Sequence, residues 1–239
     1  MSNAKGLIQY CGWLTPAQAA EGILAAKRSA AALLADAGLL LEKQRWQRGT
    51  ALAILAIEET GKIPILREVL LARNQKDLKI AWRSFRSHTK KNLLHMWPYL
   101  IAKGAKHLED FREVYDDTSD HAQTLEAVKQ LALYCDSCGL CHWSIPEDVI
   151  SQDLAKCINT IAEIVVCRGS TAFESEAELE LWVKHMKPVW KTDMGQMKRA
   201  LLACYQEAHS KGILKGKKSP AEMMNFLYKD PAGGASIVP

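Results

Sequence analysis

Apolar residues recur at steps of three and four along most of this chain, which is the spacing of one face of an α-helix. The first such segment begins at Thr15-Pro16, where threonine as N-cap and proline in the first helical position are typical of a helix start. It continues to about Lys43 with an alanine-rich apolar seam. Leucine, alanine and isoleucine dominate while valine is scarce, so the pattern predicts an all-α fold.

The same spacing, interrupted by glycine, proline and polar stretches, predicts the later helices. Gly61 is expected to cap the second helix, the pair Ile63-Pro64 to open the third, and Pro98 to end the fourth. The helices predicted after the first span about residues 49–60, 63–72, 76–96, 99–103, 123–136, 146–167, 177–186, 194–211 and 220–228, with another around 108–115.

The helix predicted over residues 76–96 has one apolar and one polar face, because an α-helix turns by about 100° per residue. Its polar arc, about 140° wide on that helical wheel, gathers Arg83, Ser84, Ser87, His88 and Lys91. Its apolar side gathers Leu78, Trp82, Phe85, Thr89, Leu93 and Met96. A face of cations, hydroxyls and one imidazole suits a polyanion better than a protein core.

Arg83 and His88 have complementary chemistry for a phosphodiester. An imidazole titrates near neutral pH and can move a proton, while a guanidinium can bind a phosphate through two hydrogen bonds. Together they could cleave RNA without a metal, by activating a 2′-hydroxyl to attack the adjacent phosphorus. The alternative is that Arg83, Arg86, His88, Lys90 and Lys91 form an ordinary solvated face of the helix.

Glu58 and Glu59 stand in the last turn of the predicted second helix, where the helix dipole disfavours negative charge. Two explanations are open. Either they form salt bridges with Lys62 or Arg67 on neighbouring turns, or one of them orients Arg83 or His88 across the bundle.

Composition narrows the class of protein. The chain has 239 residues, of which 48% are hydrophobic, enough for a sizeable core, and its net charge is only +4. Any nucleic-acid contact must therefore come from local clustering of cations. We expect no membrane-spanning segment and no secretory signal, and the seven scattered cysteines are typical of reduced thiols in a cytoplasmic protein.

Cys135, Cys138, Cys141 and His142 are the one group with the spacing of metal ligands. No second cysteine pair is available to complete a zinc ribbon, and haem attachment would require an export signal. We expect buried thiols at a helix end, with Trp143 and Ile145 anchoring the loop, and neither a metal nor a cofactor. A Cys/His metal protein of unrelated role remains an alternative.

The segment Arg83-x4-His88 matches the Arg-x(4–6)-His signature of the HEPN superfamily of helical nucleases and nucleic-acid-binding domains. The stretches 48–62, 82–90, 129–134 and 143–146 resemble AbiV-type abortive-infection proteins in order and in sequence. The resemblance covers about residues 17–168. It implies a HEPN-like helical bundle with additional C-terminal helices, and an antiphage effector that cleaves RNA.

By this resemblance Arg83 and His88 are the catalytic residues, with Glu58, Glu59 and Ser84 in support. Many active HEPN nucleases carry Asn, Asp or His directly after the arginine, and here that residue is Ser84. A module that binds RNA or a phage protein without cutting RNA, and so blocks translation, is therefore the second hypothesis. The residues expected to bind RNA are Arg86, Ser87, Lys90 and Lys91.

The expected organisation is an N-terminal arm (1–15), a HEPN-like domain (16–170) and a C-terminal helical extension with a tail (171–239). HEPN nucleases commonly dimerise so that two motifs face one groove, and the resemblance therefore implies a homodimer. The flank formed by Trp82 and Phe85 and the alanine-rich first helix are the expected contact surface. Besides RNA, a phage protein or an antitoxin is a candidate partner.

Overall fold

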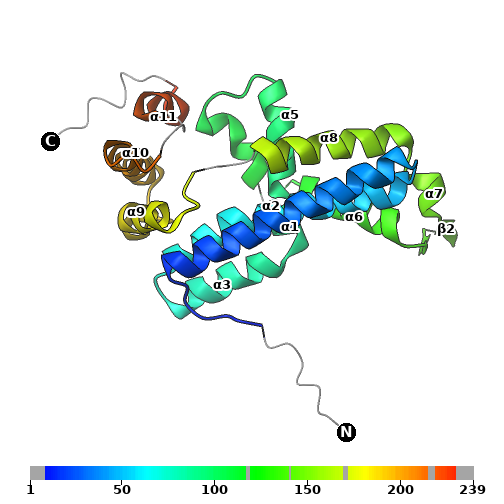
Figure 1. Cartoon of the computed structure of the whole chain (residues 1–239), viewed down its shortest axis with the longest axis horizontal. Helices are drawn as coiled ribbons and strands as arrows, with labels where there is room; N and C mark the ends of the chain where they lie inside the picture. Colours follow the sequence, from blue (N-terminus) through cyan, green and yellow to red (C-terminus); the bar gives the residue numbers. More distant parts are fainter. Residues whose placement is uncertain (1–8, 117–118, 140, 169–171, 215–218, 230–239) are drawn as a thin grey trace, which may run out of the picture.

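A computed structural model describes residues 9–116, 119–139, 141–168, 172–214 and 219–229. The first helix, α1 (Pro16–Glu42), begins where the sequence predicts: Thr15 Oγ1 accepts from the Gln18 backbone N–H, and the Gln18 side chain accepts from the Thr15 N–H. It lies along α2 (Trp46–Leu71), and these two long helices form the axis of the molecule (Figure 1).

α2 is one continuous helix, so the predicted division into helices at 49–60 and 63–72 is wrong. Gly61 does not cap it and Pro64 lies inside it. The helix is buried on nearly every side, against α1, α3 (Gln75–Arg86), α6 (His121–Leu133) and α8 (Gln152–Arg168). A glycine costs a helix about 1 kcal/mol and a proline about 3 kcal/mol, and burial of so much apolar surface outweighs both.

The predicted helix over 76–96 is also wrong, because the chain leaves the helical conformation at Ser87 (φ −81°, ψ 125°). α3 ends at Arg86, and the chain continues as the short helix α4 (His88–Lys91), a 3-10 turn (Asn92–His95) and α5 (Met96–Ala102). Pro98 sits in the first turn of α5, where its missing N–H would have no partner. Arg83 and His88 therefore lie on different helices, and the single polar arc is not formed.

A 3-10 segment (Leu108–Tyr115) and then α6 follow α5 along the chain. The stretch after α6 differs from the prediction as well. Strands β1 (Asp136–Cys138) and β2 (His142–Ser144) pair antiparallel, with Cys138 opposite His142, and lead into α7 (Pro146–Val149) and α8. The chain is not helical between α7 and α8, so the segment 146–167 forms two helices and not the single helix predicted.

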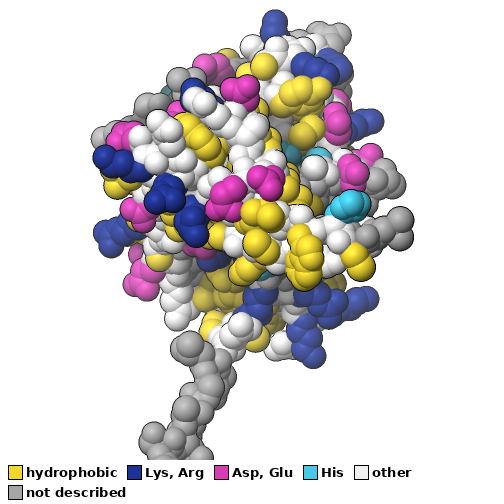
Figure 2. All heavy atoms as spheres, turned by 90° about the vertical axis from the view of Figure 1, so that its right-hand side faces the viewer, with side chains coloured by type: hydrophobic (Ala, Val, Ile, Leu, Met, Phe, Trp, Pro, Cys, Tyr) yellow, Lys and Arg dark blue, Asp and Glu magenta, His cyan; other side chains and the backbone are white. Residues whose placement is uncertain are grey.

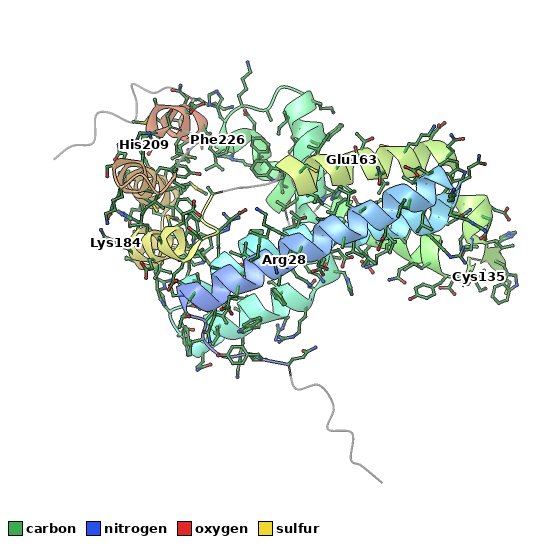
Figure 3. All side chains as sticks on the ribbon, viewed as in Figure 1. Arg28, Cys135, Glu163, Lys184, His209 and Phe226 are labelled. Atoms are coloured by element: carbon green, nitrogen blue, oxygen red, sulfur yellow. The ribbon has the colours of Figure 1, made fainter. Side chains whose placement is uncertain are left out.

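The hairpin projects at one end of the molecule, where Figure 3 labels Cys135. Cys135 and Cys141 are exposed, Trp143 is 72% exposed and Ile145 is 43% exposed, so the expected burial of these two thiols and the expected anchoring residues are wrong, while the side chain of Cys138 lies outside the described part of the structure. Figure 2, which faces this end, shows hydrophobic side chains gathered on its surface. A two-stranded hairpin has too few neighbours to bury its side chains.

The C-terminal helices α9 (Glu176–Met186), α10 (Met194–Ser210) and α11 (Pro220–Leu227) are confirmed near their predicted bounds, with a 3-10 turn (Lys187–Val189) after α9. They stack at the opposite end from the hairpin (Figure 1). Their apolar faces join α1 and α2 in one core cluster, which includes Ile23, Leu66, Phe173, Leu179, Tyr205 and Leu227.

The described part of the N-terminal arm, residues 9–14, lies over α3. The Trp82 indole N–H donates to the Gly12 carbonyl at 3.0 Å, and the Arg86 guanidinium donates to the Tyr10 carbonyl at 2.7 Å. The ring of Tyr10 meets Trp82 edge-on. Trp82 is consequently only 7% exposed, so the Trp82 part of the surface expected for dimer contacts is covered by the chain's own arm. No described helix has the length and apolar character that crossing a membrane would require.

Candidate functional site

Glu58 is the centre of a buried group of charges. It lies in the middle of α2, not in its last turn, and its side chain is 2% exposed. Lys129 of α6 places its Nζ 2.5 Å from Oε1, and His88 of α4 places Nδ1 2.6 Å from Oε2. The Nζ of Lys91 lies 3.4 Å from Oε2. One carboxylate thus holds three helices together through three nitrogen atoms.

Gly61 allows this arrangement. A Cβ built on Gly61 would lie 1.9 Å from the carbonyl oxygen of Lys91, a distance that no real Cβ tolerates. Gly61 follows Glu58 by three residues, so both face the same side of α2. The missing side chain lets α4 come against α2 and brings His88 and Lys91 to the carboxylate of Glu58.

The contact with Glu58 decides which nitrogen of His88 carries hydrogen. A carboxylate can only accept, so Nδ1–H donates to Oε2 and, in the neutral imidazole, Nε2 keeps its lone pair. The His88 side chain is 53% exposed, and Nε2 has no partner in the described part of the chain. His88 is therefore held at one ring nitrogen and free at the other, which is the arrangement of a general base.

Lys129 is 3% exposed, and its ammonium bonds two carboxylates. Besides Glu58, it lies 2.7 Å from Oε2 of Glu126 and 3.1 Å from Nδ1 of His88. Burial works to raise the pKa of Glu126, but hydrogen bonds from Lys129 and Gln130 outweigh it and lower that pKa. The charges of buried Lys91, Lys129 and Glu58 and of partly exposed Glu126 cancel formally when His88 is neutral, which reduces the cost of the burial.

Glu58, His88 and Glu126 are also the only described residues whose ligand atoms cluster closely enough for a metal ion, all within 4.8 Å of one another. The ammonium of Lys129 lies among those same atoms. A divalent ion bound there would have to displace Lys129 from Glu58, so the donor set suits a lysine bridge better than a metal.

Arg83 lies on the exposed side of α3, at an open groove of about 530 Å³. The residues lining this groove are Cys11, Lys79, Trp82, Arg83, Arg86 and Ser87, among which there is no acid. Figure 2 shows Lys and Arg side chains gathered along the lower edge, the side on which α3 lies in Figure 1. Arg83 forms no ion pair within the described residues. Ser87 lines this groove, but His88, the next residue in the chain, is not among the lining residues, so the structure does not bring Arg83 and His88 together in one groove.

Each explanation offered for the acidic pair corresponds to the contacts of one of the two residues. Glu59 forms a salt bridge with Lys62 one turn later on α2, as the structural explanation requires. Glu58 orients His88, as the functional explanation requires. Ser84 is half-buried in α3.

The residues expected to bind RNA have different surroundings. Lys91 is buried against Glu58, so its predicted place on an exposed face is wrong. Arg86 is used inside the molecule, where it donates to the carbonyls of Tyr10 and Trp82 and stacks over the Trp82 ring. Ser87 caps α4 by accepting from the Lys90 N–H at 3.4 Å, and Lys90 is exposed.

Sequence reasoning missed Lys129, Glu126, Lys79 and the role of Gly61. Lys129 lies in one of the four stretches that resemble AbiV proteins, which could have marked it. A lysine three residues after a glutamate on a helix is otherwise an ordinary surface pair. Only the contact with α2 makes it part of the site.

Comparison with known proteins supplies one match. The family model for the HEPN domain of AbiV proteins, described as AbiV, matches residues 18–166, which is more than half of the chain. The matched range contains Glu58, Gly61, Arg83, His88 and Lys129. No curated protein and no solved structure shows a significant match to the chain.

Proposed function

Because this chain belongs to the AbiV family of HEPN proteins, we propose that it is a metal-independent endoribonuclease that acts in abortive infection against phage. The observation that carries the proposal is the contact between His88 and Glu58: a buried carboxylate holds Nδ1 and leaves Nε2 exposed. Arg83, on the neighbouring helix, lines an open groove and forms no ion pair with the described part of the chain.

In this reaction Nε2 of His88 takes the proton of a ribose 2′-hydroxyl. The 2′-oxygen attacks the adjacent phosphorus, the bond from phosphorus to the 5′-oxygen breaks, and the leaving 5′-oxygen takes up the proton that the His88 imidazolium gives back as general acid. The products are a 2′,3′-cyclic phosphate and a 5′-hydroxyl. Arg83 binds the phosphate and stabilises the charge that develops on its oxygens. Glu58 is a positioning residue, since it acts on the RNA only through His88.

The test is incubation of the pure protein with total RNA in the presence of a chelator. We expect fragments with 2′,3′-cyclic phosphate ends, and His88→Ala should slow their formation by about 10²–10⁴-fold, the usual contribution of a general base. Circular dichroism should show that the variant is folded, since the His88 side chain is half-exposed. Cleavage by His88→Ala at the wild-type rate would overturn the assignment.

The role of Glu58 is separated from a structural one by steady-state kinetics. Glu58→Gln keeps the shape of the side chain but removes its negative charge. Because Glu58 acts on the RNA only through His88, we expect a lower kcat with an unchanged KM for RNA. A misfolded site would change both constants. Glu59→Gln, which removes the neighbouring carboxylate bound to Lys62, is the matched control and should leave kcat unchanged.

The second candidate is a module that binds RNA or a phage protein without cleaving RNA. The observation that favours it is Ser84, a half-buried residue where active HEPN nucleases commonly carry Asn, Asp or His. The same incubation distinguishes the two candidates. RNA that stays intact but shifts in a native gel would favour the binding module.

A further inference from the structure

Lys79 lies one helical turn before Arg83 and lines the same groove. It is exposed, and it forms no ion pair or hydrogen bond through its side chain within the described residues. The nearest acid in the sequence, Asp77, is occupied at the start of α3, where its carboxylate accepts from the Arg73 backbone N–H and the Asn74 amide. Lys79 and Arg83 therefore line the groove as two cations that no acid among the described residues pairs with.

The other lining residues exclude most ligands besides a phosphate chain. Trp82 is buried under the arm and its ring contacts Tyr10 and Phe85, so it offers no face on which a base could stack. The guanidinium of Arg86 is occupied by backbone carbonyls. The groups that the groove offers to a charged ligand are Lys79 and Arg83, and their charge attracts phosphate without carrying information about base identity.

The spacing of the two cations suits consecutive phosphates of one strand. Residues four apart on an α-helix are separated by about 6 Å along its axis, which is comparable with the distance between neighbouring phosphates. A base-paired A-form strand holds each 2′-oxygen out of line with the leaving 5′-oxygen, so cleavage by 2′-hydroxyl attack requires an unpaired strand.

We propose that the groove on α3 is a phosphate-binding subsite for single-stranded RNA, in which Lys79 binds the phosphate adjacent to the one held by Arg83. The proposal rests on the proposed function. Lys79 contributes affinity and fixes the register of the strand, but it gives no sequence preference.

The experiment measures the affinity of the full chain for a short unstructured oligonucleotide with 2′-O-methyl riboses, which cannot be cleaved. Each phosphate neutralised on a single strand contributes about 0.7 to the slope of log affinity against log salt concentration. We expect Lys79→Ala to reduce that slope by about 0.7 for both oligo-U and oligo-A, and Lys79→Arg to restore it.

Lys156→Ala is the matched control, because it removes the same charge from an exposed position on α8 outside the groove. It should leave the slope unchanged. If Lys79→Ala binds with the wild-type slope, the subsite is wrong while the nuclease is untouched, since cleavage of unmodified RNA is measured separately. If the wild-type chain neither binds nor cleaves RNA, the proposed function falls together with the subsite.

Discussion

At the scale of single residues, the site depends on one carboxylate. A lone buried charge would lower the stability of the fold by several kcal/mol. The buried carboxylate of Glu58 is tolerated because the ammonium groups of Lys129 and Lys91 balance its charge. The same compensation gives His88 a fixed orientation, because Nδ1 has a strong acceptor at 2.6 Å. Stability and chemistry therefore depend on the same four side chains.

Replacing Lys129 by methionine should show this dependence. Lys129→Met leaves the Glu58 carboxylate buried without its closest counter-charge, so we expect the free energy of unfolding to fall by about 3–5 kcal/mol. Urea denaturation followed by circular dichroism measures it. Lys156→Met, at an exposed position, should change stability by less than about 0.5 kcal/mol. A loss below about 1 kcal/mol in Lys129→Met would mean that Lys91 alone balances Glu58.

At the scale of elements, the break at Ser87 and the crossing at Gly61 act together. Because the chain leaves the helical conformation at Ser87, α4 runs in a different direction from α3. Because Gly61 has no side chain, the backbone of α4 at Lys91 can cross α2 closely at this point. Arg83 consequently stays at the exposed groove while His88 turns to Glu58. Two helices with different neighbours thus give the two functional side chains different surroundings.

The crossing can be tested with a pair of glycine substitutions. Gly61→Ala puts a methyl group into the Lys91 backbone and should lower stability by about 1–3 kcal/mol, with loss of cleavage because α4 is displaced. Gly38→Ala, in α1, meets nothing within 4 Å and should raise stability by about 0.5–1 kcal/mol. Chemical denaturation distinguishes them, and equal effects at both positions would contradict the crossing.

The packing of α10 on α9 should depend on pH. Glu207 of α10 accepts hydrogen bonds from Lys184, Lys211 and His185, which lower its pKa from 4.5 to about 2. A carboxyl whose pKa is lowered by folding stabilises the fold above its ordinary pKa, and this is lost as pH falls from about 4.5 toward 2.

Glu207→Gln should therefore lower the melting temperature at pH 7 and flatten its dependence on pH in that window. Glu180→Gln removes an exposed acid of α9 that forms no hydrogen bond or ion pair within the described residues, and it should retain the wild-type dependence. Thermal melts between pH 2 and 7 measure both. An unchanged pH profile in Glu207→Gln would show that the hydrogen bonds from these three side chains do not stabilise the helix pair.

At the scale of the whole molecule, the HEPN portion and the C-terminal helices share one core. Ile23 of α1, Leu66 of α2 and Leu179 of α9 belong to the same buried cluster, so the C-terminal helices complete the bundle at the end opposite the hairpin. The arm meanwhile covers Trp82. The surface through which we propose that two copies meet must therefore lie outside that flank.

Mixing two inactive variants tests the homodimer. If each cleft takes Arg83 from one subunit and His88 from the other, an equimolar mixture of Arg83→Ala and His88→Ala should recover about a quarter of wild-type cleavage. Half of the dimers are mixed, and each mixed dimer has one intact cleft of two. Single-turnover cleavage after refolding together measures it, with each variant alone as control. No recovery in a mixture that forms mixed dimers would place both residues in one subunit's site.

The sequence by itself determined what depends on neighbours along the chain. The helical content, the start of α1 at Thr15-Pro16, the start of α11 at Pro220 and the amphipathic faces of α9 and α10 follow from caps and periodicity, which act within a few residues. The pair Arg83 and His88 was also visible, because a motif is a local pattern.

Tertiary structure alone decided the rest. α2 continues through Gly61 and Pro64 because three other helices and α1 cover it, and the chain breaks at Ser87 because α4 packs against α2. Lys91 and Lys129 are ordinary surface lysines by sequence, and they are buried only because Glu58 lies opposite them. Such outcomes depend on contacts between residues 30 to 71 positions apart, whose energies exceed the local preferences.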